Sequence, residues 1–411
     1  MDEPSAVSLD PVGSTELEDP GRTDGLAGLS WAAVANLLTA LGNTVSVFAI
    51  SVAAGSDERF GVYAAALATM VFAFSVSRGL LGETLTLQRD VAISARQYVA
   101  ASFWLTAALG IGCGAVLTIS SDTRSIAALS AAAVFALLFN DALRHWAFRH
   151  QAPRAVAISD GLWFLGSLAL YVVAVAADVG PGWVFGLWAA TGLAVALPLV
   201  RVPAAATAAS SAMAWLRSTS TLSMKLAAEA SAAAAAVTVP LAATAVVMID
   251  GHEAGGIRLL QSFFGFQQIA FFSALVTIGS AANSSRRQAY RAGVVLAVAG
   301  SVLSLVVAVM VLVIPTSLLT DLLGESATVA RDGVWSFAAL QVLIAVSNGA
   351  LLAMRAGGKA TEATVPRVIG ALVATVLATL LMGGGVDGFA LGSSIGVVVF
   401  MVLLIRPLRR L

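Results

Sequence analysis

Five ionisable side chains stand inside long apolar runs of this sequence, where a charge needs a specific reason. They are Arg78, Glu83, Asp141, Asp160 and Glu229. A charge in the middle of a membrane-spanning helix costs about 2.5 to 3.5 kcal/mol on insertion scales, so such residues commonly pair with one another or bind substrates and ions. Asp160, Glu229 and Glu83 are therefore candidates for holding a coupling cation. Arg78 and Asp160 are candidates for contacting a substrate.

A purely structural role is open for two of the acids. Asp141 can pair with Arg144 or His145, which follow it at helical spacing, and this interpretation is favoured. Glu229 can pair in the same way with Lys225.

Asp160 and Arg78 are harder to explain by local pairing. Asp160 has no basic neighbour on its own helical turn, so it is the acid least easily assigned a structural role. The long side chain of Arg78 could reach the inner headgroups, yet the apolar run continues through Leu80 and Leu81, which keeps Arg78 at membrane depth. For Arg78, function and structure are evenly balanced.

A polar stripe runs along the first apolar segment. Asn36, Thr39, Asn43 and Ser46 recur at helical spacing and fall on one face. Such a face either lines a cavity, which makes all four candidates for substrate binding, or packs against another helix through hydrogen bonds.

Other chemistries find no support. The three histidines lie in connections between apolar runs, and there is neither a glycine-rich phosphate loop with its lysine nor a metal-ligand cluster. Cys113 is the only cysteine, so no disulfide forms within one chain. The formal net charge is zero, and nothing points to nucleic acid. We expect no catalytic residue, no cofactor, no bound metal and no enzymatic activity.

The amino-acid composition indicates the environment of these side chains. Hydrophobic residues make up 59% of the chain and charged residues 11%, with a mean hydropathy of +0.90. Soluble domains carry about 25% charged residues. The sequence therefore predicts an all-α integral membrane protein.

Twelve segments have about the 20 apolar residues that one membrane crossing requires. They span 29–54, 61–87, 98–119, 126–146, 155–176, 183–200, 226–249, 256–281, 292–314, 333–354, 368–382 and 389–405. Seventeen of the 23 Lys and Arg residues fall after even-numbered segments and four after odd-numbered ones. Because basic loops stay in the cytoplasm, both termini are predicted inside, in a multi-pass protein of the cytoplasmic (plasma) membrane. The intramembrane charges then lie in the inner third of their helices, as an inward vestibule with more acids than bases.

The long connection after the sixth segment divides the chain. We predict a disordered acidic cytoplasmic tail over 1–28, a six-helix bundle over 29–200, a cytoplasmic linker over 201–225, a second six-helix bundle over 226–405 and a basic tail over 406–411. The bundles are expected to enclose a central cavity. Within the linker, Met213, Trp215 and Met224 favour a short helix on the inner leaflet, and a flexible linker is the alternative.

Three segments resemble one family of transporters. They are DERFGVY at 57–63, RGLLGE at 78–83 and the stretch 149–163. The sequence resembles the polysaccharide and O-antigen flippases of the multidrug/oligosaccharidyl-lipid/polysaccharide exporter superfamily. The resemblance implies that two bundles rock about a central cavity to flip a lipid-linked oligosaccharide, with Arg78 on the pyrophosphate. It also implies membrane lipids, the lipid-linked glycan, and glycosyltransferases or a polymerase of polysaccharide synthesis as partners.

Two alternatives remain. An excess of acids in the vestibule disfavours an anionic head group and favours a cation-coupled exporter of small amphipathic or cationic compounds. A non-transporting scaffold of polysaccharide synthesis is the third hypothesis, and it predicts a closed interior.

Overall fold

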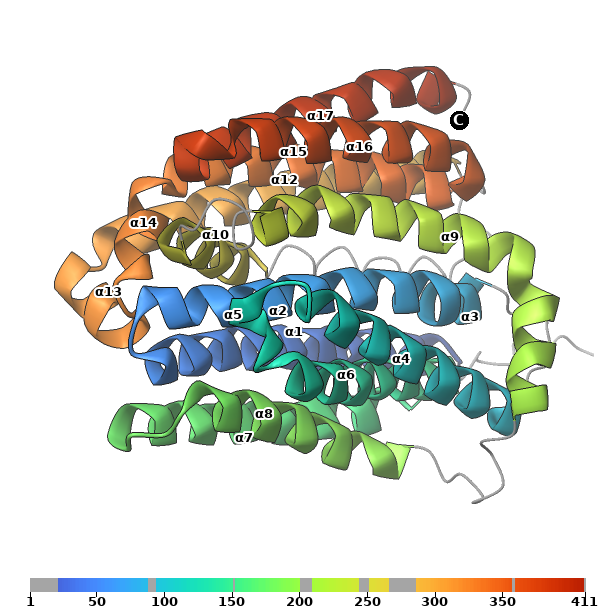
Figure 1. Ribbon diagram of the computed structural model, residues 1–411. Helices are drawn as coiled ribbons and strands as arrows, with labels where there is room; N and C mark the ends of the chain where they lie inside the picture. Colours follow the sequence, from blue (N-terminus) through green and yellow to red (C-terminus); the bar gives the residue numbers. More distant parts are fainter. Residues whose placement is uncertain are drawn as a thin grey trace, which may run out of the picture.

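The computed structural model describes residues 21–87, 94–150, 152–199, 209–243, 251–265, 286–356 and 359–409. Within these ranges every regular element is a helix, which confirms the all-α prediction (Figure 1). The helices are long and run roughly parallel and antiparallel to one another (Figure 1). Because a helix satisfies its own backbone hydrogen bonds, it is the structure expected for a chain that is surrounded by lipid.

The first half of the chain contains six long helices. Its elements are α1 (Gly21–Ala54), α2 (Asp57–Ser77) continued by the π-helical turn η1 (Arg78–Glu83) and α3 (Thr84–Leu87), α4 (Ala95–Leu117), α5 (Ser121–Arg124), α6 (Ala127–Arg149), α7 (Pro153–Ala176), and α8 (Pro181–Ala196) with η2 (Leu197–Leu199).

The second half has the same build. Its elements are α9 (Ala209–Ala243), α10 (Gly251–Phe264), α12 (Arg286–Val313), α13 (Thr316–Leu323), α14 (Ser326–Asp332), α15 (Val334–Ala356), η5 (Ala360–Ala363), α16 (Thr364–Leu381), η6 (Met382–Gly384) and α17 (Gly385–Arg409).

Ten stretches of the described chain are long and apolar enough to cross a membrane. The last of them, Thr364–Leu408, contains both α16 and α17, which reverse at Gly385 (φ 61°) and pack together. The predicted eleventh and twelfth segments are therefore both helices. Helix α10 covers the start of the predicted eighth segment, whose remainder over 266–281 lies outside the described residues. The orientation of the termini stays a prediction.

The helices form two bundles, as predicted. In the first, α1 packs along α7 and α4 packs along α6; in the second, α12 packs along α15 and α16 along α17. Small residues bring these pairs close. A Cβ on Gly349 of α15 would collide with the carbonyl oxygen of Gly293 of α12. The central cavity stays a prediction.

Helix α2 belongs to both bundles. It contacts α4 and α6 on its own side, and α9 and α10 on the other. The approach is closest at η1, where a Cβ on Gly79 would lie 2.5 Å from the Cα of Ala227 in α9. This helix is therefore the main contact between the halves.

Three boundaries differ from those predicted, one of them at the end of α17, which continues to Arg409 into the predicted basic tail. Helix α1 begins at Gly21, within the segment predicted as a tail, and α9 begins at Ala209, within the predicted linker, and continues unbroken through 225. The start of α9 is held by Trp215, which is 1% exposed and packs in a cluster with Leu81 and Trp146. The linker is thus helical from 209 onward, but its aromatic anchor faces protein, while Met213 and Met224 on the same stretch are exposed.

Candidate functional site

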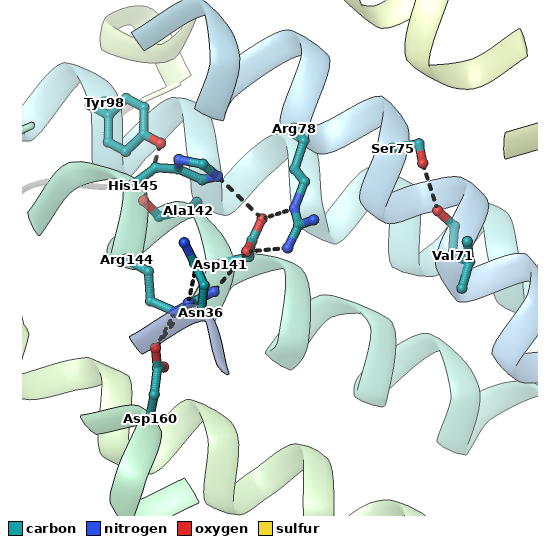
Figure 2. Close-up of polar contacts among 10 residues, drawn as sticks. All are labelled: Asn36, Val71, Ser75, Arg78, Tyr98, Asp141, Ala142, Arg144, His145 and Asp160. Atoms are coloured by element: carbon teal, nitrogen blue, oxygen red, sulfur yellow. Dashed lines mark hydrogen bonds and ion pairs between the residues drawn. The ribbon is translucent and has the colours of Figure 1, made fainter. Parts of the chain in front are cut away.

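Arg78 is paired with Asp141, a partnership between two helices that the sequence did not reveal. From η1, its Nε lies 2.8 Å and its Nη2 2.9 Å from the two carboxylate oxygens of Asp141 on α6 (Figure 2). This bidentate geometry is the strongest form of an arginine–carboxylate contact. Asp141 is 5% exposed, so the pair is largely shielded from solvent.

Arg144 extends this pair to Asp160. Its Nη1 lies 3.2 Å from Asp141, as predicted for an i,i+3 pair, and its Nη2 lies 2.9 Å from Asp160 on α7 (Figure 2). Asp160 is 1% exposed. The absence of a basic residue on its own turn was therefore misleading, because the partner comes from α6, near the end of the fourth predicted segment.

His145 is the other predicted neighbour of Asp141. Its Nε2 lies 3.6 Å from the carboxylate. Its ring packs on η1, where a Cβ on Gly82 would come within 2.6 Å of the ring. Next to it, the Tyr98 hydroxyl donates a hydrogen bond to the carbonyl oxygen of Ala142 (3.1 Å; Figure 2). A glycine in the π-helical turn is thus what admits the imidazole.

A second cluster surrounds Glu229 on α9. The predicted pairing with Lys225 is wrong, because the Glu229 carboxylate instead binds Arg355 at 3.0 Å and Arg367 at 2.6 Å. Arg355 ends α15, and Arg367 lies in the first turn of α16. Arg355 also lies 3.1 Å from Glu83, which reaches it from η1 in the other half. Thr364 adds a contact of 3.5 Å to Glu229.

The two clusters occupy equivalent places in the two bundles. The first joins the first, second, fourth and fifth long helices, and the second joins the seventh, tenth and eleventh predicted segments. The turn η1 connects them, since it carries both Arg78 and Glu83. Together they make a sequence of alternating charges that we call the charge row: Asp160, Arg144, Asp141, Arg78, Glu83, Arg355, Glu229 and Arg367.

The charge row corrects the predicted excess of acids. It contains four carboxylates and four guanidiniums, because Arg144, near the end of the fourth predicted segment, and Arg355 and Arg367, outside the predicted segments, belong to it. Asp160, Glu229 and Glu83, the predicted cation ligands, each lie against an arginine. Among the described residues, no group of three or more His, Cys, Asp or Glu side chains could hold a metal ion.

The polar stripe of α1 is mostly a packing surface. The hydroxyls of Thr39 and Ser46 donate to carbonyl oxygens one turn earlier, and the Asn36 Oδ1 accepts from Arg144 (3.5 Å; Figure 2). Asn43 differs because it is exposed. At about 100° per residue it points away from the exposed apolar Val34. Asn43 is thus the exposed member of the four, and a role of the stripe in substrate binding stays a prediction.

Arg258 is a further charged residue that the sequence analysis did not name. It lies near the start of the eighth predicted segment, within α10, among positions that are mostly buried. Its Nη1 donates to the Gln261 Oε1 (3.1 Å), and no carboxylate pairs with it in the described part of the chain. The signal in the sequence was the i,i+3 spacing of Arg258 and Gln261.

Comparison with known proteins identifies the fold. No protein-family model matches the chain, and no curated protein matches its sequence. Among solved structures, the eukaryotic MATE transporter AtDTX14 is similar with a TM-score of 0.65 at 16% identity, over 93% of this chain and 95% of that one. An inward-facing multidrug resistance MATE family transporter of the MOP superfamily gives 0.60 at 15% identity, over 92% and 98%. A Vibrio cholerae MATE transporter, VcmN, gives 0.57 at 11% identity, over 95% and 99%. The chain therefore has a MATE-like fold along nearly its whole length.

Proposed function

We propose that this protein is a membrane transporter that works by alternating access between its two bundles. The observation that carries the proposal is the MATE-like fold, which covers 93% of the chain and leaves only small parts of the similar transporter unmatched. Transport by rocking bundles requires an interface that separates at one end while it closes at the other. The contacts between the halves meet this requirement.

The bundles touch through different chemistry at their two ends. At the end that carries α3, the ion pair of Glu83 with Arg355 lies beside the packing of α9 on η1, where Gly79 approaches Ala227. At the end that carries α13, the Ser51 hydroxyl donates to the carbonyl oxygen of Leu323 (2.6 Å), and the Tyr171 hydroxyl donates to that of Leu322 (3.3 Å). Figure 1 shows α3 and α13 at opposite ends of the molecule. Opening of either end would break these polar contacts together with the apolar packing that the two halves share.

Export of small amphipathic compounds is the substrate class with the better support. Solved transporters with this fold include proteins described as multidrug resistance transporters. The exposed Asn43 supplies a polar group on α1. A coupling cation at Asp160 or Glu229 would have to displace an arginine from that acid, so coupling would run through the ion pairs themselves.

Flipping of a lipid-linked oligosaccharide is the second candidate, and one observation favours it. The charge row is neutral, which removes the excess of acids that disfavoured an anionic head group. Contact of Arg78 with a pyrophosphate would require release from Asp141. The cytoplasmic membrane, and the glycosyltransferases or polymerase as partners, belong to this candidate as proposals.

Locking one end of the molecule tests the transporter proposal. The variant S51C/L323C places two thiols where α1 meets the end of α13, and the only native cysteine, Cys113, is buried. Oxidation is expected to stop transport in liposomes, and reduction is expected to restore it. The single variants S51C and L323C under the same oxidation are the controls.

Full activity of the cross-linked protein would contradict alternating access. The phenotype of cells that lack the protein then distinguishes the two candidate functions. Loss of drug tolerance identifies an exporter, and loss of surface polysaccharide identifies a flippase. The scaffold hypothesis gains if an N43C variant is inaccessible to aqueous thiol reagents.

A further inference from the structure

The first turns of α9 lie across one end of the molecule, whereas the other long helices run along it. Figure 1 shows these turns at the end that carries α3, at a steep angle to the rest of the bundle. Because the long helices cross the bilayer, a helix that lies across their ends runs along the membrane surface.

One face of these turns is fixed to the first half of the protein. Trp215 and Thr219 are each 1% exposed, and the Trp215 ring meets the Tyr98 ring of α4 edge-on at 5.7 Å. Trp215 also belongs to the cluster that contains Leu81 and Trp146. This packing determines which side of the helix faces outward.

The opposite face is exposed, and it combines apolar with basic side chains. Met213 and Met224 are 50% and 63% exposed, and Arg217 and Lys225 are exposed as well. Met213, Arg217 and Met224 recur at helical spacing, so they fall on one side of the helix. A helix face with apolar side chains flanked by cations is typical of helices that lie on a lipid surface.

The charge of this face has a single sign. No Asp or Glu occurs between residues 209 and 228. In the described part of the chain, no ion pair involves Arg217 or Lys225, and both line an open depression of about 230 Å³ together with neighbouring Ser and Thr residues. Arg96, exposed in the first turn of α4 two residues before Tyr98, adds another cation at this end.

We propose that the face of α9 with Met213, Arg217, Met224 and Lys225, which we call the basic face, docks on negatively charged lipids of the membrane leaflet at the α3 end. The methionines enter the boundary between head groups and acyl chains, and the cations lie against the negative surface. These lipids surround the protein and are not its cargo, so the inference goes beyond the proposed transport function. It bears on the junction of the two halves, because α9 continues from this face to Glu229 in the second bundle.

Quenching of a fluorescent label by lipids tests this docking in the full-length protein. A bimane is attached to the variant Met213→Cys, whose only other cysteine, Cys113, is buried. The bilayers are phosphatidylcholine with a small fraction of spin-labelled phosphatidylglycerol or spin-labelled phosphatidylcholine. We expect the anionic lipid to quench more strongly. Arg217→Gln and Lys225→Gln are each expected to lower this preference about fivefold, and added salt is expected to lower it further.

Arg59→Gln and Arg124→Gln are the matched controls. These exposed cations lie at the opposite end, at the start of α2 and in α5, and their removal changes the net charge by the same amount. They are expected to leave the preference unchanged.

Three results would overturn the docking. They are equal quenching by the two lipids, an equal loss of preference in the control variants, and no quenching by either lipid, which would place the basic face in water or against another protein. If Arg217→Gln does not fold, Lys225→Gln and the dependence on salt decide the question, because Lys225 is exposed and belongs to no ion pair among the described residues.

Discussion

Asp141 and Arg144 show how the interior charges are tolerated at the scale of single residues. Asp141 accepts from Arg78 and Arg144, and Arg144 continues to Asp160, so each charge has partners on two sides. Arg258 stands in contrast, since its recorded side-chain partner is the neutral Gln261. Arg144 and Arg258 both lie within predicted membrane-spanning segments, but among the described residues only Arg144 is paired with carboxylates.

The two arginines are predicted to respond oppositely to the same change. Arg144→Gln leaves Asp141 and Asp160 short of a partner, so the free energy of unfolding is expected to fall by about 3 to 5 kcal/mol. Arg258→Gln removes a cation that has no carboxylate among the described residues, so stability is expected to stay or rise. Thermal unfolding in detergent measures both. A larger loss in Arg258→Gln than in Arg144→Gln would refute this account.

The pairs also mark the limit of what single residues in a sequence reveal. The i,i+3 pair of Asp141 with Arg144 was predictable because one helix fixes its geometry. The contacts Arg78–Asp141 and Arg355–Glu229 depend on how separate helices pack, which no local pattern encodes. The charges of Arg78, Asp160, Glu83 and Glu229 could therefore be picked out from the sequence, but their partners could not, and a role for these residues in binding stays a prediction.

At the scale of elements, the turn η1 is the feature on which the interface depends. The Thr84 hydroxyl donates to the Gly79 carbonyl oxygen (2.8 Å), five residues earlier, within the widened turn. Glycines at 79 and 82 let α9 and His145 approach this turn. Both glycines are in the RGLLGE segment that carries the family resemblance, so that segment serves packing as well as charge.

Gly79→Ala is predicted to weaken the contact between the bundles. The added Cβ would lie 2.5 Å from a backbone atom of Ala227, which cannot move aside alone, so a loss of about 1 to 3 kcal/mol is expected. Gly112→Ala in α4 is the control, because nothing lies within 4 Å of its Cβ and alanine is the better helix former. Thermal unfolding distinguishes them, and equal stability of the two variants would count against a close interface at η1.

The elements themselves were largely predictable from apolar length. The segment predicted over 155–176 is α7, Pro153–Ala176, and the one predicted over 126–146 is α6, Ala127–Arg149. The start of α9 was not predictable by this rule, because its Ser- and Thr-rich first turns are polar in sequence. They are held in the helix by hydroxyls that bond to the preceding turn, as Thr219 does to the Trp215 carbonyl oxygen (3.1 Å), and by burial of Trp215.

At the scale of the whole molecule, the two ends of the interface oppose each other. Glu83→Gln removes the ion pair at the α3 end, and Ser51→Ala removes the hydrogen bond at the α13 end. Glu83→Gln is predicted to favour opening at the α3 end, and Ser51→Ala to favour opening at the α13 end. The shift in free energy for Ser51→Ala is expected to be about 0.5 to 1.5 kcal/mol. Distances between spin labels across each end measure the shift.

Ser220→Ala is the matched control for this prediction. Ser220→Ala removes a hydroxyl that bonds only the carbonyl oxygen of Arg217 one turn earlier, on an exposed part of α9, and it is expected to leave both distances unchanged. If Glu83→Gln and Ser51→Ala opened the same end, the two contacts would not act as alternate closures.

The balance of signs along the charge row has an electrical consequence. The row as a whole sums to zero, but the first half holds three of its carboxylates and two of its guanidiniums, so opening at η1 separates one negative from one positive charge. A single uncompensated elementary charge would gain or lose about 2.3 kcal/mol per 100 mV. A turnover rate that changes with membrane voltage would consequently report this separation together with the valence of the cargo and its co-travelling ions.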